Sequence, residues 1–219
     1  MMGNDEIREI IVTLRGFNRR FQEPIVTEVA RERRSPFAIL IATLISLRTK
    51  DDVTRAASQR LLAMADTPEK MVRLPVQAIE KAIYPAGFYK TKAIRIHDIC
   101  EILLREYDGK VPDSLDELLK LKGVGRKTAN LVITQGFGKL GICVDTHVHR
   151  ISNRLGLVKT GTPDKTEMAL REILPREFWI EYNDLLVTFG QNLCGPISPR
   201  CSECPISHLC PRIGVKKCR

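Results

Sequence analysis

The sequence lacks the features of a membrane or secreted protein. It has no run of 18 consecutive apolar residues, so we expect no membrane-spanning helix. Residues 1–10 mix charged and apolar side chains, and no apolar stretch follows a basic start, which argues against a secretory signal. We therefore expect a cytoplasmic protein. In that reducing compartment, the seven cysteines are not expected to form a disulfide framework.

Strand patterns, internal repeats and Gly/Ser linkers are also absent. Apolar residues recur instead at helical spacing, and Ser35-Pro36 supplies a cap and first turn for a nearly all-apolar segment, 37–47. That segment is too short for a bilayer and is interpreted as a buried central helix. Further helices are predicted over 7–17, 51–64, 92–107, 115–121, 126–135, 146–155, 163–174 and 177–193, with short ones opening at Thr67-Pro68 and Leu74-Pro75. The pattern predicts an all-α protein.

Charge is unbalanced toward the basic side. Lys and Arg number 35 against 26 for Asp and Glu, giving a formal net charge of +9. Such a surface attracts phosphates and favours nucleic-acid partners, but many basic proteins bind none. Charge alone therefore leaves the partner open.

Two glycines separate a predicted helix that begins with the capping pattern Ser114-x-x-Glu117 from the next predicted helix. Glycine permits unusual backbone angles and close backbone approach, and the N–H groups that start the second helix form an anion site. A DNA phosphate fits such a site without base specificity. Gly123, Val124, Gly125 and Arg126 are the predicted contacts. The alternative is an ordinary tight turn.

Lys127 lies just inside the second helix, close to that anion site. A surface lysine is usually only a solvated charge. It becomes a nucleophile when its amine is neutral, which burial or neighbouring cations favour, and Arg126 and Lys122 are near in sequence.

Asp145 stands 18 residues further on, where the segment V-D-T-H-V-H-R begins another helix. The simplest interpretation of Asp145 is an N-cap. A carboxylate at a helix N-terminus also stabilises positive charge on a sugar, or assists deprotonation. His147 and His149 are typical of structural histidines.

The segments L-K-G-V-G-R-K-T-A-N and V-D-T-H-V-x-R resemble the endonuclease III family of helix-hairpin-helix DNA glycosylases, and the resemblance runs from about Ile25 to Cys210. It implies that Lys127 attacks C1′ of a flipped damaged nucleotide and that Asp145 is the essential carboxylate. It also implies a base-excision repair enzyme that removes oxidised pyrimidines from double-stranded DNA and cuts the strand by β-elimination. We expect a monomer, located at the nucleoid if the source is prokaryotic.

Four cysteines follow the spacing C-x6-C-x2-C-x5-C within 17 residues: Cys194, Cys201, Cys204 and Cys210. Four thiolates suit zinc or an iron–sulfur cluster, and spacing alone leaves both open. The family resemblance implies a [4Fe–4S] cluster on this spacing. Cys218 is interpreted as a free thiol, and Cys100 and Cys143 as core residues.

Base extrusion requires groups that fill the gap left in the duplex. Phe88 matches the position of the family's apolar wedge, although without the family it could equally be a core residue. Arg48 stands where better-known members have glutamine, which leaves the lesion range open. Arg200 is the one charge in the loop between the first two box cysteines, which is more basic in the family.

The resemblance also implies two lobes. One is a helical barrel over 25–136 that carries the helix-hairpin-helix at 114–136; the other joins 1–24 to 137–219 and holds the cluster loop, 194–210.

Two alternative functions remain open. A monofunctional mismatch glycosylase would lack Lys127, and a non-catalytic DNA-binding module would make Lys127 and Asp145 coincidental.

Overall fold

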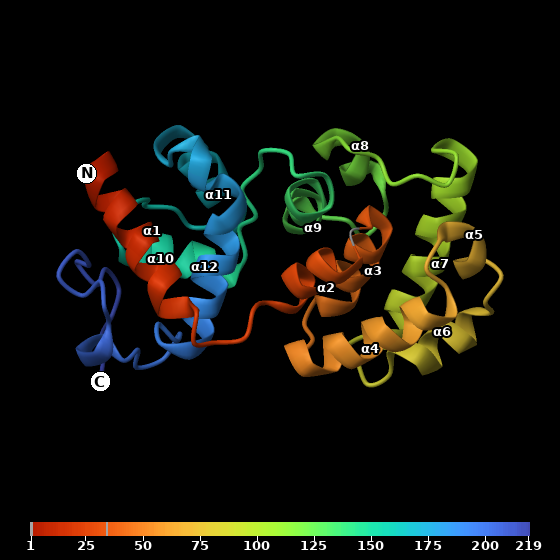
Figure 1. Ribbon diagram of the computed structural model, residues 1–219, viewed down its shortest axis with the longest axis horizontal. Helices are drawn as coiled ribbons and strands as arrows, with labels where there is room; N and C mark the ends of the chain where they lie inside the picture. Colours follow the sequence, from red (N-terminus) through yellow and green to blue (C-terminus); the bar gives the residue numbers. More distant parts are fainter. Residues whose placement is uncertain (1, 34) are drawn as a thin grey trace. The chain divides into compact units, whose positions relative to one another are not determined.

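The computed structural model describes residues 2–33 and 35–219 (Figure 1). Helices and connections account for all of the described part of the chain, without strands, which confirms the all-α prediction. Within that part no helix has the length and apolar character needed to cross a membrane. The chain divides into two compact units, here called the hairpin unit (25–139) and the cysteine-box unit (1–24 with 140–219).

The hairpin unit is built around α3 (Pro36–Ser46). Ser35 caps this helix, with its hydroxyl accepting from the Ala38 N–H at 3.3 Å, and Pro36 occupies the first turn. Every side chain from Phe37 to Ile45 is buried. The predicted central helix is therefore confirmed, and its neighbours cover it on all sides.

The other elements of the hairpin unit follow in chain order: α2 (Ile25–Arg33), α4 (Asp51–Met64), α5 (Pro68–Met71), α6 (Val76–Ile83), α7 (Tyr89–Glu106), α8 (Leu115–Lys120), α9 (Arg126–Leu131) and the π-helical turn η1 (Val132–Gly136). Helix α3 contacts α2, α4, α7, α9 and η1.

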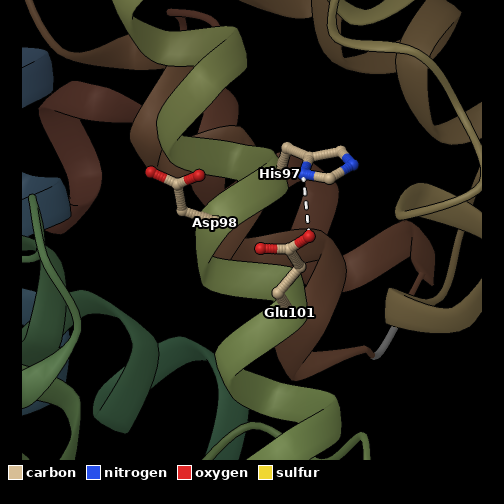
Figure 2. Close-up of side chains that lie close together, drawn as sticks. All are labelled: His97, Asp98 and Glu101. Carbon is tan, nitrogen blue, oxygen red and sulfur yellow. Dashed lines mark ion pairs between the residues drawn. The ribbon is translucent and has the colours of Figure 1, made fainter.

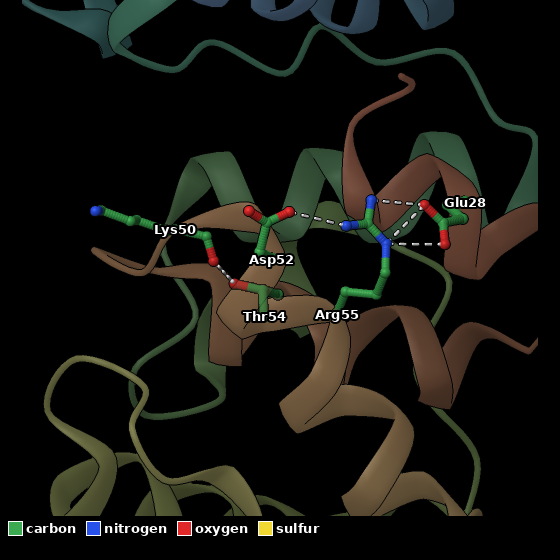
Figure 3. A network of polar contacts seen from close by, with 5 residues as sticks. All are labelled: Glu28, Lys50, Asp52, Thr54 and Arg55. Carbon is green, nitrogen blue, oxygen red and sulfur yellow. Dashed lines mark hydrogen bonds and ion pairs between the residues drawn. The ribbon is translucent and has the colours of Figure 1, made fainter. Parts of the chain in front are cut away.

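A half-buried ion pair joins α2 to α4 (Figure 3). The Arg55 guanidinium donates from Nη2 to Glu28 Oε2 at 2.8 Å and from Nε to Oε1 at 3.0 Å. The hydrogen bonds from Arg55 hold the pKa of Glu28 below its ordinary value, so the pair contributes stability that is lost as falling pH protonates Glu28. Asp52 adds an exposed contact to Arg55, and the Thr54 hydroxyl donates to the Lys50 carbonyl at 3.0 Å. The pair thus holds the start of α4, immediately after the loop that carries Arg48.

The cysteine-box unit has its own core. Its elements are α1 (Asn4–Asn18), α10 (Thr146–Arg154), α11 (Pro163–Ile173), η2 (Arg176–Phe178), α12 (Trp179–Asn192) and η3 (Cys201–Glu203). Helix α12 packs against α1 and α10, and α10 packs against α11. Their apolar faces form one cluster, which Ile206 of the cysteine loop joins with 1% of its surface exposed.

Three local features differ from the sequence prediction. The short helix α2 was not predicted, since its β-branched residues have low helix propensity and packing against α3 stabilises it. The predicted helix over 126–135 ends in the π-helical turn η1. The Ser114 hydroxyl accepts from the Glu117 N–H as expected, but the Glu117 carboxylate binds Tyr107 and Lys120 rather than completing the capping box.

Candidate nucleic-acid interface and cysteine site

Helices α8 and α9 form a hairpin in which the two glycines have different roles. Gly123 has a φ of +94°, and a Cβ there would lie 2.7 Å from Nη1 of Arg95. Gly123 is therefore required by its backbone conformation, whereas the Arg95 side chain could move away from a Cβ. Gly125 has a φ of −94°, and a Cβ there would have no atom within 4 Å. The fold would therefore accommodate a side chain at position 125, and the glycine leaves open space in front of α9.

The start of α9 has the features expected of an anion site. Gly125 is the N-cap and has no side chain to cap the helix, whose first turn contains Arg126 and Lys127, both half-buried. The side chain of Val124 is buried, and its N–H donates to the Leu121 carbonyl at 2.9 Å. Val124 thus holds the turn.

Beside the hairpin lies a hollow with an empty volume of about 990 Å³. It brings together three residues predicted from sequence: Arg48, Phe88 and Gly123. Phe88 is 64% exposed, so its interpretation as a core residue is wrong. The Arg48 guanidinium lies 5.6 Å from the centre of the Phe88 ring, within cation–π range.

Sequence analysis missed Thr91, Lys92 and Arg95, which also line this hollow. They follow Phe88 along α7 at intervals of three and four, so helical periodicity counted from Phe88 would have found them. Among the described residues that line this hollow, three are cationic, Arg48, Lys92 and Arg95, and none is acidic. Such a lining suits a phosphate backbone.

Lys92 has the environment expected of a candidate nucleophile, because burial lowers its pKa to about 8. Its ammonium, however, donates to the carbonyls of Ile45 and Leu47, both at 2.6 Å, and to the Thr49 hydroxyl at 2.8 Å. All three N–H donors are committed within the protein. The geometry therefore gives Lys92 a supporting role.

Asp145 is the N-cap of α10. Its Oδ1 accepts from the N–H groups of His147 at 2.8 Å and Val148 at 2.9 Å, while the residue remains partly exposed. Nδ1 of His147 lies 3.1 Å from Arg150, and Nδ1 of His149 lies 2.7 Å from the Thr166 hydroxyl. Both histidines are thus engaged within the protein.

The four box cysteines line one hollow. The buried Arg154 organises it, with Nη1 donating to Cys194 Sγ at 3.2 Å and to the Gly195 carbonyl at 2.7 Å. Nη2 of Arg154 reaches the Pro196 carbonyl at 2.9 Å. Sequence reasoning did not single out this arginine, although it lies one turn after Arg150 on α10.

Burial, and to a lesser extent the neighbouring thiols, suppress the ionisation of Cys201, Cys204 and Cys210. Burial raises the pKa of Cys204 to about 11, with further upward contributions from Cys210, Cys194 and Cys201. Four thiolates side by side therefore need a positive centre to stabilise them. The donor set fits a metal or metal cluster.

The remaining cysteines and Arg200 have local partners. Cys100 and Cys143 are buried in the core, as expected. Cys218 is an exposed free thiol, as expected, and with burial as the larger cause it contributes to raising the pKa of Cys201. The Arg200 guanidinium donates to the Asn192 carbonyl and contacts Glu203.

One other group of potential ligands lies on α7: His97, Asp98 and Glu101 (Figure 2). His97 pairs with Glu101 at 3.7 Å, and its Nε2 lies 3.3 Å from the Val72 carbonyl. Residues one turn apart on a helix commonly pair in this way. The contacts are those of an ordinary helix surface.

Comparison with known proteins identifies the class. Residues 41–176 match the HhH-GPD superfamily of base excision DNA repair proteins. An all-helical chain with this hairpin and this match is a member of that class.

Individual relatives narrow the class. The chain is 45% identical over 196 residues to endonuclease III of Thermotoga maritima, covering 85% of this chain and 92% of that protein. It is 48% identical over 189 residues to a chloroplastic endonuclease III homologue of Arabidopsis thaliana, of which it spans 49%. A solved structure of a trapped endonuclease III–DNA covalent intermediate matches with a TM-score of 0.84 at 35% identity, covering 97% of each chain. The protein belongs to the endonuclease III family.

Alanine substitutions of the two hairpin glycines should affect different properties, stability at Gly123 and DNA affinity at Gly125. Gly123→Ala places a side chain at positive φ against Arg95, and we expect it to lower the free energy of unfolding by at least about 1 kcal/mol. Gly125→Ala should lower the free energy of unfolding by less than about 1 kcal/mol, as a poorer N-cap, but weaken duplex DNA binding about 10- to 100-fold by obstructing a phosphate. Thermal melts and fluorescence anisotropy measure the two effects. Full DNA affinity in Gly125→Ala would exclude the start of α9 as the phosphate site.

Proposed function

We propose that this protein is a bifunctional DNA glycosylase and abasic-site lyase that removes oxidised pyrimidines from duplex DNA. The observation that carries the proposal is the position of Lys127 in the first turn of α9, directly after the hairpin glycines. Its place in the endonuclease III family supports the same activity. The enzyme would act as a monomer on DNA inside the cell.

In this proposal the neutral amine of Lys127 attacks C1′ of the extruded nucleotide. The C1′–N bond to the damaged base breaks, and the base leaves with the bonding electrons and a proton. The proton taken by the base comes from the attacking nitrogen, and opening of the sugar, in which the ring oxygen O4′ takes up a proton from solvent, gives a protonated Schiff base between Lys127 and C1′. Removal of a C2′ proton then expels the 3′ phosphate by β-elimination, and water releases the amine.

Asp145 supplies the negative charge. Its two backbone hydrogen bonds both use Oδ1, and they hold the carboxylate at the N-terminus of α10. A carboxylate held in this way would stabilise positive charge on the sugar as the base departs. The cap and the catalytic group would then be the same residue.

DNA contacts would come from several elements. The start of α9, with Gly125 and Arg126, would bind one phosphate, and the hollow beside it would receive the opened strand. Arg48 and Phe88 would fill the gap left by the extruded nucleotide. Arg200, whose side chain is 41% exposed, would contact the backbone further along.

Cys194, Cys201, Cys204 and Cys210 would hold a [4Fe–4S] cluster, which supplies a cationic core that binds four thiolates. Four thiolates suit zinc or an iron–sulfur cluster, and the family resemblance on the spacing C-x6-C-x2-C-x5-C favours the cluster.

Lys127→Ala should abolish covalent trapping. Borohydride reduces a Schiff base, so the protein should form a stable adduct with abasic-site DNA. We expect the adduct yield to fall at least about 1000-fold in Lys127→Ala. Lys122→Ala, which removes an exposed lysine from the same hairpin, is the matched control and should trap normally. If the wild-type protein releases the damaged base but forms no adduct, it is a monofunctional glycosylase. If it does not release the base either, it is a DNA-binding module.

Asp145→Asn should separate capping from chemistry. Asparagine caps helices about as well as aspartate, so the free energy of unfolding should stay within about 1 kcal/mol of wild type. Without the negative charge, base release should slow by about 100- to 10,000-fold. Single-turnover kinetics and thermal melts measure the two quantities. Unchanged kinetics would reduce Asp145 to a cap.

Cys204→Ser should lose the cluster, whereas Cys218→Ser should keep it. We expect about four iron and four sulfide ions per chain in the wild type and in Cys218→Ser. In Cys204→Ser both counts, and the visible absorption band, should fall sharply. One zinc ion per chain, without sulfide, would contradict the cluster assignment.

A further inference from the structure

Lys92 binds the loop that follows α3. The residue is 7% exposed, and its ammonium donates to the carbonyls of Ile45 and Leu47 and to the Thr49 hydroxyl oxygen. The last carbonyls of a helix have no intrahelical donor, and a cation at a helix C-terminus complements the helix dipole. Lys92 therefore terminates α3 and fixes the chain directly after it.

Thr49 connects this loop to a second loop, between α6 and α7. Its Oγ1 accepts from Lys92 Nζ at 2.8 Å and from the Gly87 N–H at 3.1 Å. A Cβ on Gly87 would lie 2.5 Å from the Arg48 carbonyl oxygen, so only glycine allows the two loops to approach this closely. One hydroxyl therefore joins both loops to one buried ammonium.

The two residues that these loops present to solvent are strained. Arg48 has a φ of 53° and Phe88 a φ of 57°, in the left-handed region that non-glycine residues rarely adopt. Both are exposed, and the Arg48 guanidinium lies over the Phe88 ring. Strained residues persist only where the surrounding structure holds them. Here the hydrogen bonds through Thr49 supply that restraint.

We propose that Lys92, acting through Thr49, is a positioning residue that holds Arg48 and Phe88 as a single preformed wedge for opening the duplex. This inference rests on the proposed glycosylase function, because a wedge is needed only where a nucleotide is extruded. A preformed wedge enters the base stack without paying the cost of ordering two loops. Lys92 touches neither the DNA nor the reacting sugar in this role.

Substituting Thr49 tests the proposal better than substituting Lys92. The variant Lys92→Met would leave buried carbonyls without a donor and would destabilise the fold. Thr49→Val keeps the shape and removes the hydroxyl, whereas Thr49→Ser keeps the hydroxyl. Each cluster-loaded variant would be assayed on two substrates. One is a duplex with an oxidised pyrimidine beside 2-aminopurine, whose fluorescence reports unstacking. The other is a single strand with a preformed abasic site, which needs no extrusion.

For Thr49→Val we expect the single-turnover rate on the duplex to fall about 10- to 100-fold, with a smaller 2-aminopurine signal. Borohydride trapping of the single-stranded abasic site should stay within about twofold of wild type. Thr49→Ser should restore both duplex readouts. These results together would support the wedge.

Three outcomes would overturn it. In the first, Thr49→Val has the wild-type rate on the duplex. In the second, it loses activity equally on the duplex and on the single strand. In the third, Thr49→Ser shows the same loss of duplex activity as Thr49→Val. A wild-type protein that traps no abasic-site DNA would instead refute the proposed function itself, and the wedge with it. The two failures are therefore distinguishable.

Discussion

The complete burial of α3 is the constraint on which the hairpin unit depends. A helix with every side chain from Phe37 to Ile45 buried must be covered on all sides, and five other elements surround it. Its backbone ends still need polar partners, because buried carbonyls without donors destabilise a fold. Ser35 meets that need at the N-terminus and Lys92 at the C-terminus. The use of Lys92 at the C-terminus of α3 places an ammonium group beneath the loops that carry Arg48 and Phe88.

Helix ends carry the candidate functional groups in both units. Gly125 starts α9 without a capping side chain, which suits an external anion, whereas Asp145 caps α10 with a carboxylate that remains partly exposed. The same backbone requirement therefore produces an anion site in one place and a fixed negative charge in another. We propose that the enzyme uses the first for DNA phosphate and the second for the sugar.

The cysteine loop is held mainly by polar contacts rather than by apolar packing. Few apolar residues follow Cys194; among the described residues of this segment Ile206 is buried in the core, and Leu209 packs against it partly buried. Arg154 compensates by donating to the carbonyls of Gly195 and Pro196 and to Cys194 Sγ. A guanidinium satisfies several loop carbonyls at once because its donors point in fixed, separate directions. A cluster on the four cysteines would complete this restraint.

The sequence by itself determined the helices other than α2 and the π-helical turn η1, most of their caps, the core residues Cys100 and Cys143, the hairpin glycines and the cysteine spacing. Each of these follows from local chemistry or from periodicity along the chain. Only the tertiary structure decided that Phe88 is exposed beside Arg48, that Lys92 joins two loops more than thirty residues apart through Thr49, and that Arg154 holds the cysteine loop. Local patterns record which backbone groups a helix leaves without partners. They do not record which distant side chain will satisfy them, because that choice is made when the helices pack.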